Sequence, residues 1–476
     1  PIEALGERPG VGQFAPLGHL SVATDEAEKE ATHLYFDGRR PVRTITVQAG
    51  LSIACTHRHR LRVIDREGNY VWKSAGEIEC GDYLAVVKGS RVFGHSDTLP
   101  QVEFPVALRR TRYKDLNIPS HWTPELARFL GYVLSEGYLY RHKGKPHSGT
   151  LTLSHSLAQE RVTEDLVEVT RALFGDRPRF SRRRGSLFVQ VHSSKLLYWL
   201  SALGIHGKTE AQTIPEALLA APYEIQVEFL RALFSGDGSW KNEGEAVTYS
   251  TKSRQLASRL QQMLLNFGYL FSLSVEGRQG RQEPSYTLSL TGAGEVRRFL
   301  HEIGFISTHA EMDVRHLRAG GLEHPDLTEL ESLVSKNLVF LPVIAIEEGE
   351  ADVYDLFVPE GNAYVANGFV SHNTINFGII YGMSGYGLAQ RTGLSQEEAD
   401  RFIKNYFARY PGVGRYVEGI KRKAHEQGYV ETLLGRRRYI PELRSSNRNV
   451  RMAAEREAIN TPIQGTAADI IKIAMV

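Results

Sequence analysis

The sequence predicts a multidomain chain in which an all-β module is interrupted by an α+β domain and followed by a mainly α segment. Residues 31–90 alternate apolar and polar side chains in short runs, and turn sequences such as Asp37-Gly38 separate these runs, as in a set of short strands. Between 121 and 310, apolar runs with helical spacing alternate with basic, polar strand-like runs. From residue 374 onward the apolar residues again follow helical spacing.

The composition is that of an ordinary globular protein. A chain of 476 residues has room for about two to four domains, and its 42% hydrophobic and 24% charged residues are unexceptional. No apolar run reaches the length of a membrane span and no leader is visible, so we expect no membrane association, a cytoplasmic location and a monomer. The cysteines, Cys55 and Cys80, are expected to be buried thiols in strands. Because the chain starts at Pro1 and stops at Val476 inside an apolar helical pattern, we expect a fragment of a longer protein.

Charge is distributed unevenly along the chain. Residues 374–476 contain 16 Lys and Arg against 10 Asp and Glu, a net charge of +6, which leaves −4 for the preceding residues of a chain whose total is +2. A basic C-terminal segment suits contacts with nucleic-acid phosphates. A solvated basic surface is the alternative that charge alone leaves open.

A first candidate site lies in the β module, in the run Cys55-Thr56-His57-Arg58-His59. Thr56 and His59 are three residues apart between two strand patterns, so their side chains can converge on one backbone carbonyl. A simple surface turn is the alternative from these residues alone.

The far end of the β module carries matching blocks. Residues 353–373 contain Asp355 and end in Val370-Ser-His372-Asn373. In this order and spacing, the two regions resemble the splicing blocks of inteins. Residues 50–63 are similar to the block with the Thr-x-x-His pair, and residues 354–373 are similar to the two C-terminal blocks.

The resemblance implies an intein of the Hint fold over residues 1–373. Its N-terminal part is expected at 1–100 and its C-terminal part at 325–373. Residues 1–6 are similar to the tail of the first intein block, whose initial Cys or Ser nucleophile would precede them.

The residues at the downstream junction suit self-cleavage. The side-chain amide of Asn373 can reach its own carbonyl carbon and close a five-membered succinimide, so an intramolecular attack replaces a bimolecular one. His372 is expected to titrate near neutrality, to polarise the scissile amide and to protonate its leaving nitrogen. Thr374 supplies a hydroxyl that accepts, by transesterification, the protein segment that precedes the intein. No cofactor is expected for splicing.

The intein resemblance implies roles for three further residues. His59 would protonate the leaving amide at the upstream junction, Thr56 would help to position it, and Asp355 matches the acidic position of the penultimate block. That block usually carries a His where this chain has Asn362, whose amide exchanges no proton near neutral pH. Cleavage at Asn373 is therefore expected to depend more on His372.

Two segments inside the α+β region echo each other. One reads Phe129-Leu-Gly-Tyr-Val-Leu-Ser-Glu136-Gly, and the other reads Phe229-Leu-Arg-Ala-Leu-Phe-Ser-Gly-Asp237-Gly. Each is an apolar helical run with a small residue in its face, and each ends in an acid and a glycine. Close packing of the two helices would bring both carboxylates together, where they can hold Mg²⁺ for phosphodiester hydrolysis. An ordinary glycine-capped helix end is the alternative for each motif alone.

This pair resembles the LAGLIDADG homing endonucleases. Glu136 and Asp237 are 101 residues apart, as in a single-chain pseudo-dimer. The resemblance implies an α+β domain over 121–310 with the order αββαββα, Glu136 and Asp237 as catalytic Mg²⁺ ligands, and Lys208 as the intermediate lysine. Double-stranded DNA at a homing site is the implied partner, and we expect the arginines at 177, 179 and 182–184 along its phosphates.

The residues after Asn373 suggest a nucleotide site. Phe377 and Tyr381 are four apart and share one helix face, from which an aromatic ring can stack on a base. Core packing is the alternative for this spacing alone. The run from Thr374 to Gly382, the run Gly435-Arg436-Arg437-Arg-Tyr, and the later Asn460-Thr-Pro-Ile-Gln464-Gly resemble family A DNA polymerases.

The polymerase resemblance covers 374–476 and implies a fingers and palm segment. Phe377, Tyr381 and Gly382 would lie at the incoming dNTP and templating base. Contacts with the primer–template would come from Arg436, Arg437, Arg456, Asn460 and Gln464. The complete, spliced host would add dNTPs to a primer with Mg²⁺, in DNA replication and repair. The metal-binding carboxylates of the family are not in this segment, and Asp469 is not one of them.

Two other interpretations predict different sequences. A stand-alone homing endonuclease with a vestigial splicing domain would not need an unbroken polymerase pattern after Asn373. A Hint-type processing domain fused to a binding module would not be expected to contain the paired acidic motifs or Thr374.

Overall fold

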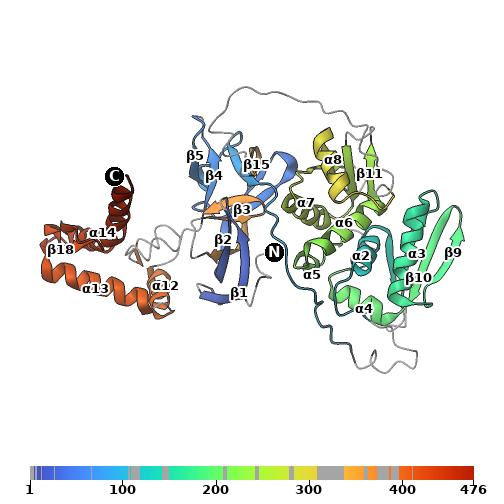
Figure 1. Ribbon diagram of the computed structural model, residues 1–476, viewed down its shortest axis with the longest axis horizontal. Helices are drawn as coiled ribbons and strands as arrows, with labels where there is room; N and C mark the ends of the chain where they lie inside the picture. The colour runs from blue at the N-terminus through green and yellow to red at the C-terminus, as the bar shows by residue number, and fades with distance from the viewer. Residues whose placement is uncertain are drawn as a thin grey trace. The chain divides into compact units, whose positions relative to one another are not determined.

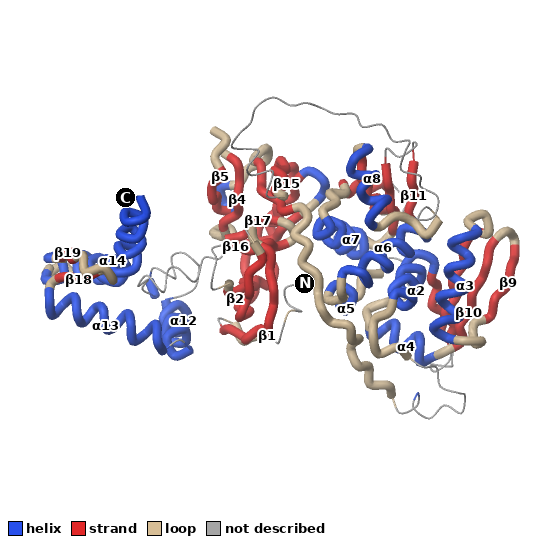
Figure 2. The backbone as a smooth tube through the Cα atoms, in the orientation of Figure 1, coloured by secondary structure: helices blue, strands red, loops and turns tan. Residues whose placement is uncertain are grey.

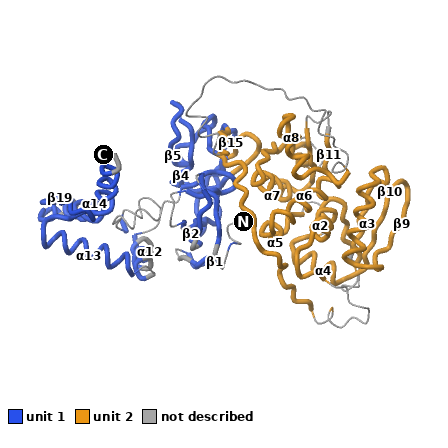
Figure 3. The backbone as a smooth tube through the Cα atoms, in the orientation of Figure 1, with its two compact units in different colours: residues 1–45, 53–85, 342–476 blue, residues 46–52, 86–341 orange. Residues whose placement is uncertain are grey.

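The structure of the protein is a computed structural model (Figure 1). It describes residues 5, 8–11, 13–25, 27–65, 67–105, 108, 118–141, 149–206, 212–241, 246–277, 284–307, 337–358, 363–372, 385–386, 396–409 and 411–475. Two compact units are present (Figure 3). Unit 1 comprises residues 1–45, 53–85 and 342–476, and unit 2 comprises residues 46–52 and 86–341.

The β module of unit 1 is built on one nine-stranded sheet, with the main order β1-β2-β15-β6-β17-β4-β5. Strand β3 pairs with β2, and β16 pairs with β17. The strands are β1 (Gln13–Ala23), β2 (Glu28–Val47), β3 (Ser52–Cys55), β4 (Arg60–Ile64), β5 (Tyr70–Ser74), β6 (Tyr83–Val87), β15 (Leu338–Phe357), β16 (Ala363–Ala366) and β17 (Phe369–His372).

Strand β17 joins two parts of the sequence that are far apart. It lies between β6 and β4 in the sheet, and its Ser371 pairs with Leu61 of β4. Figure 2 shows β17 and β4 among the strands of this module. Phe369, Val370 and Ser371 are all buried. The last strand before Asn373 is therefore an inner strand of the sheet, beside the strand that follows His59.

A small apolar core and one buried thiol accompany this sheet. Leu34, Leu356, Val358 and Tyr364 are buried together in the core. Cys55 is buried at the end of β3, but Cys80 is exposed and lies outside the strands, so the expectation of two buried thiols is wrong for Cys80.

Unit 2 contains two halves with the same element order. The first half consists of α2 (Pro124–Glu136), β7 (Gly137–Arg141), β8 (Gly149–Ser156), α3 (Glu160–Phe174), β9 (Arg179–Arg183), β10 (Ser186–His192) and α4 (Ser194–Ala202). The second consists of α6 (Tyr223–Asp237), β11 (Gly238–Lys241), β12 (Ala246–Thr251), α7 (Arg254–Phe267), β13 (Ser272–Glu276), β14 (Ser285–Thr291) and α8 (Ala293–Glu302). Between them lies the short helix α5 (Glu216–Leu219). Each half therefore has the order αββαββα.

The two sheets of unit 2 have equivalent topologies, β7-β8-β10-β9 and β11-β12-β14-β13. Residues from both halves share one apolar core, which explains why neither half needs a core of its own. Local sequence sets the ends of the helices. The hydroxyls of Thr123, Ser193 and Ser253 accept backbone N–H groups at the starts of α2, α4 and α7. Gly268 ends α7 in the left-handed conformation.

Small residues let α2 and α6 approach closely. A Cβ at Gly131 would lie 2.6 Å from the carbonyl oxygen of Phe229 and 2.9 Å from the Cβ of Ala232. At the same end of the pair, a Cβ at Gly236 would lie 2.5 Å from the Cβ of Ser135. Only hydrogen fits in these places, so Gly131 and Gly236 determine how closely the helices pack.

Unit 2 also includes the turn between β2 and β3. Gln261 of α7 donates from Nε2 to the carbonyl oxygens of Ala49 at 2.6 Å and Phe271 at 2.8 Å. Ala49 and Gly50 both have positive φ, 75° and 80°. A buried amide thus holds a backbone turn in a left-handed conformation, which a non-glycine residue rarely adopts.

The C-terminal part of the chain is mainly helical, as expected, with one β-hairpin. Its elements are α12 (Gln396–Arg409), α13 (Pro411–Gln427), β18 (Tyr429–Glu431), β19 (Arg437–Tyr439), η7 (Pro441–Arg444) and α14 (Arg448–Met475). The apolar pattern of the sequence predicted helices here and no strand. Gly428 directly precedes β18 and Gly435 lies in the turn between β18 and β19, and both have positive φ, 74° and 82°.

Gly131→Ala should destabilise unit 2 by about 1–3 kcal/mol, because the new methyl group overlaps backbone atoms of α6. Gly294→Ala is a matched control. Gly294 lies in α8 with no atom within 4 Å of an added Cβ, so that change should stabilise by up to about 1 kcal/mol. Thermal unfolding followed by tryptophan fluorescence measures both, since Trp122, Trp199 and Trp240 lie in unit 2. Equal effects of the two substitutions would contradict this account of the helix pair.

Candidate functional sites

The first site forms where β17 meets β4. The turn before β4 brings His59 into position, because the His59 N–H donates to the carbonyl oxygen of Thr56 at 3.0 Å and its own carbonyl accepts from Ala75 N–H at 2.7 Å. The ring of His372 meets the ring of Trp72 edge-on, with centroids 4.7 Å apart. His59 is close enough to His372 for their charges to interact. The structure therefore brings Thr56, His59 and His372 to one part of the sheet.

Both histidines are neutral at pH 7. Burial lowers the pKa of His59 to about 4, and the neighbouring His372 contributes. Burial also lowers the pKa of His372 to about 4, together with the positive charges of Arg60 and Arg62. The expectation that His372 titrates near neutrality is therefore wrong, because the sequence does not show that two arginines flank its ring.

The pKa of Asp355 is shifted in the opposite direction. Its Oδ1 accepts from the hydroxyl of Tyr364 at 2.8 Å and from the Leu356 N–H at 2.9 Å. Burial nevertheless raises the pKa of Asp355 to about 7, and the charge of Asp37 adds to this effect. A large fraction of Asp355 is consequently protonated at neutral pH. Asn373, Thr374 and Asn362 lie outside the described residues.

The second site lies where α2 and α6 end. Glu136 and Asp237 are the last residues of the two helices, and a Cβ at Gly236 would lie 3.3 Å from Cγ of Glu136. Solvent reaches Asp237, yet the loss of surrounding water, together with the charge of Glu136, raises its pKa to about 7, while His155 has the opposite effect. Lys208 lies outside the described residues.

Two residues that sequence reasoning did not place at this site accompany the acids. His155 of β8 is buried, and its Nδ1 lies 2.7 Å from Oε1 of Glu136. Burial opposes a charge on this imidazole, but Glu136, Gln159 and Asp237 outweigh burial and raise the pKa of His155. Tyr249 of β12 is buried, and its hydroxyl has no partner in the part of the chain that the structure describes.

A strand pattern could have found both residues. His155 alternates with the buried Leu151 and Leu153, and Tyr249 alternates with the buried Val247. A polar group on an apolar strand face needs a buried partner, and both strands pair with the strand that directly follows an acidic helix end.

The donors at this site fit a hard divalent cation. Carboxylate oxygens are its preferred protein ligands, and Mg²⁺ is usually held by one or two carboxylates together with substrate phosphates. The described residues contain no group of three or more His, Cys, Asp or Glu arranged as a complete metal site. Glu136 and Asp237 therefore fit a cation that takes its remaining ligands from water and from substrate phosphates.

Beside the acids, the sheets present an open polar face. The strand register places Tyr138, Tyr140, Phe188, Arg179 and Arg183 opposite the helix-packed side, and Tyr138 and Tyr140 are exposed. Arg182 belongs to the other side of β9, with Phe180, so it does not share the face of Arg179 and Arg183. Alternate residues of a strand point to opposite faces.

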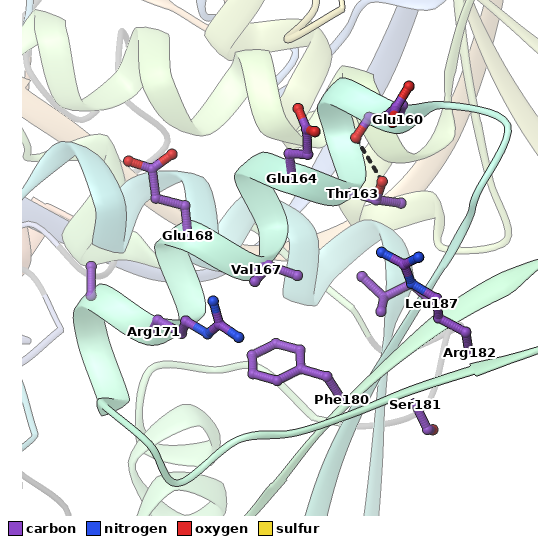
Figure 4. Close-up of a pocket in the computed structure, with 11 residues that line it drawn as sticks. Glu160, Thr163, Glu164, Val167, Glu168, Arg171, Phe180, Ser181, Arg182 and Leu187 are labelled. Atoms are coloured by element: carbon purple, nitrogen blue, oxygen red, sulfur yellow. Dashed lines mark hydrogen bonds between the residues drawn. The ribbon is translucent and has the colours of Figure 1, made fainter.

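On that other side, α3 and the β9–β10 hairpin enclose a hollow (Figure 4). Acidic residues Glu160, Glu164 and Glu168 line it from α3, and Arg182 and Phe180 line it from β9. The guanidinium of Arg171 lies 5.0 Å from the centre of the Phe180 ring. These charges of both signs neutralise one another and do not form a uniform phosphate-binding surface.

The third candidate site lies in the C-terminal part. Arg456, Asn460 and Gln464 are four residues apart along α14, so they share one helix face. Arg436 pairs with Asp469 through Nε at 2.7 Å, and Arg437 pairs with Glu431 through Nε at 2.8 Å. Both arginines are more than half exposed, at 54% and 53% of the side chain, whereas Asp469 and Glu431 are 11% and 25% exposed. Phe377, Tyr381 and Gly382 lie outside the described residues.

Family models match two parts of the chain. Residues 371–476 match the model described as DNA polymerase family A, and residues 224–304 match the model described as a LAGLIDADG-like domain. The second match covers α6 to α8. No described helix is long and apolar enough to cross a membrane.

Known proteins resemble the C-terminal part closely. DNA polymerase I of Pseudomonas aeruginosa is 59% identical over 106 residues, which cover 22% of this chain and 12% of the relative. DNA polymerase I of Bacillus caldotenax is 60% identical over 102 residues, with 21% and 12% covered. A solved structure, the POL domain of Pol1 from M. smegmatis in complex with DNA primer-template and dNTP, is 56% identical, with 21% and 18% covered and a TM-score of 0.20. The chain thus spans about an eighth of the length of these curated relatives.

His59 and His372 should titrate with midpoints near pH 4 in an NMR titration of their ring signals, because burial and nearby positive charge oppose protonation. Unfolding releases both rings to the ordinary value of 6.5. Because the unfolded chain then binds protons more readily than the folded one, the free energy of unfolding of the β module should be unaffected by these rings above pH 6.5 and should fall progressively as the pH falls toward 4. His59→Gln or His372→Gln should weaken that acid-side loss. Midpoints near the ordinary value would contradict the burial of these rings.

Proposed function

Because residues 371–476 are a segment of a family A DNA polymerase and residues 224–304 form a LAGLIDADG-like domain, we propose that the chain is part of a DNA polymerase I precursor interrupted by a self-splicing intein with a homing endonuclease. The observation that carries the proposal is the insertion of unit 2 between strands of the β module. Apart from residues 46–52, unit 2 runs in the sequence from the end of β6 to the start of β15 of one sheet. The last strand of that sheet ends at His372, and the polymerase match begins at Ser371.

The β module supports the splicing part of the proposal. Asn373 attacks its own carbonyl carbon, the 373–374 amide breaks, and a succinimide forms while the leaving nitrogen gains a proton. A neutral His372 suits the first part of this step, since it can accept a proton from the attacking amide or donate an N–H hydrogen bond. A donor with a pKa near 7 is better matched to protonation of the leaving group, and Asp355 has this property.

Thr56 and His59 serve the upstream junction in this proposal. His59 follows the Thr56 turn directly and lies near His372, so both junctions would be processed on one part of the sheet. Thr374 supplies the hydroxyl for transesterification before Asn373 cyclises.

Unit 2 supports site-specific cleavage of double-stranded DNA. Glu136 and Asp237 would hold Mg²⁺, which activates water and stabilises the leaving oxygen when bound. Lys208 would lie near this centre. Tyr138, Tyr140, Arg179 and Arg183 lie on the open face of the first sheet, where they would contact the duplex.

The C-terminal part supports template-directed addition of dNTPs in DNA replication and repair, again with Mg²⁺. Phe377, Tyr381 and Gly382 would contact the dNTP and the template base. The face of α14 with Arg456, Asn460 and Gln464 would lie along the primer–template, together with Arg436 and Arg437 once their ion pairs have opened. A cytoplasmic, monomeric protein is part of the same proposal.

Asn373→Ala should abolish cleavage of the 373–374 bond, because alanine has no amide with which to close the succinimide. Mass spectrometry of the purified chain over time detects the released piece that starts at Thr374. Asn376→Ala, on the polymerase side of the same junction, is the matched control and should leave release unchanged. Release from the Asn373→Ala chain would show that another reaction breaks this bond.

Asp237→Asn should lower cleavage of a plasmid that carries the uninterrupted host gene by at least about 100-fold, because it removes one of the two carboxylates that hold Mg²⁺. Cleavage of the 373–374 bond should continue at the same rate, since Asp237 lies in the other unit. If Asp237→Asn cuts as fast as the unchanged chain, the nuclease centre lies elsewhere.

A further inference from the structure

The two acids at the ends of α2 and α6 have unequal surroundings. Oε1 of Glu136 is bound by Nδ1 of His155 at 2.7 Å, whereas Oε2 has no partner within the described ranges. For Asp237, neither carboxylate oxygen has a hydrogen-bond partner among the residues that the structure describes. One acid is therefore held in place and the other is not.

A second contact holds the ring of His155 in place. Its Nε2 lies 2.9 Å from Oε1 of Gln159, at the start of α3, and only 4% of its side chain is exposed. Both ring nitrogens are thus occupied by oxygens, and the ring cannot rotate without losing one contact. Such a chain of contacts behind a metal-binding carboxylate is a common way to fix its orientation.

The second half has no equivalent of this histidine. Gly137 pairs with Leu153 in the first sheet, and Gly238 pairs with Tyr249 in the second, so the register places Thr251 where the first half has His155. The half with the histidine is also the half whose helix ends in Glu, with one more methylene than Asp.

From this asymmetry we infer that His155 is a positioning residue for Glu136: it holds Oε1, so that Oε2 alone is presented to the cation, and the longer Glu side chain is what allows both contacts. The inference rests on the proposed endonuclease function. It explains why Glu stands at position 136, where the second half has Asp.

Two substitutions of His155 separate its contacts. His155→Asn keeps an N–H donor near the place of Nδ1 and loses the contact with Gln159. His155→Gln reaches toward Gln159 and loses the contact with Glu136. His155→Asn should behave like the unchanged chain, whereas His155→Gln should need about 10–100-fold more Mg²⁺ for half-maximal cleavage.

Glu136→Asp tests the same contact from the other side. The shorter side chain cannot reach both His155 and the cation. Glu136→Asp should therefore need as much Mg²⁺ for half-maximal cleavage as His155→Gln does. The double variant Glu136→Asp/His155→Gln should be no worse than either single change, since both remove one interaction. His301→Gln, an exposed histidine on α8, is the control for loss of an imidazole and should change nothing.

A second measurement does not depend on cleavage. Mg²⁺ alone should raise the unfolding temperature of unit 2, followed by tryptophan fluorescence, and His155→Gln should shift this response to higher Mg²⁺ while His155→Asn should not. Equal responses of the Asn and Gln variants, or additive effects in the double variant, would overturn the role of His155. If the unchanged chain neither responds to Mg²⁺ nor cuts DNA, the proposed endonuclease fails, and this inference fails with it.

Discussion

The pairing of β17 with β4 is the contact on which the β module depends. It places residues 369–372 inside a sheet in which strands β1 to β6 end more than 280 positions earlier in the sequence. Closing so long a loop is entropically tolerable only because the cost grows slowly with length and because the intervening chain folds by itself. The Lys88 N–H donates to the carbonyl oxygen of Asn337 at 2.7 Å, so the two ends of the nested segment meet. A domain whose ends meet can be inserted between two strands without disturbing their pairing.

The same pairing sets the charges at the proposed splicing centre. An inner strand excludes water from His372, and β4 brings Arg60 and Arg62 beside it. Both effects favour the neutral imidazole. Asp355 is deprived of water in the same way, which favours its neutral carboxylic acid. A reaction at a backbone amide needs groups that exchange protons with an uncharged substrate. At pH 7 this environment keeps both histidines neutral and leaves Asp355 close to its pKa.

Sequence patterns predicted the architecture better than the chemistry. The repeated helix, acid and glycine around Glu136 and Asp237 predicted two helices and their ends, because helical periodicity and a glycine stop are local signals. The order αββαββα followed only from the resemblance that these motifs carry. The role of His155 could not be predicted in this way, since its contact with Glu136 crosses from a strand to a helix end. The lowered pKa of His372 depends on β4, which is distant in the sequence. The short hairpin at 429–439 was missed because three-residue strands have too little periodicity to detect.

Under the proposed function, each of the three sites acts on a different substrate, and the charges of its side chains differ accordingly. The splicing centre acts on a neutral peptide bond and keeps His59 and His372 uncharged at pH 7. The endonuclease centre gathers two carboxylates at adjacent helix ends, where the charge of Glu136 helps to raise the pKa of Asp237 and a bound cation would favour both charged forms. The polymerase segment holds the half-exposed guanidiniums of Arg436 and Arg437 in ion pairs with Asp469 and Glu431, and these pairs would have to open before DNA phosphates could bind. The charge on the side chains therefore distinguishes the sites: neutral imidazoles serve the neutral substrate, carboxylates serve the cation, and arginines serve the phosphates.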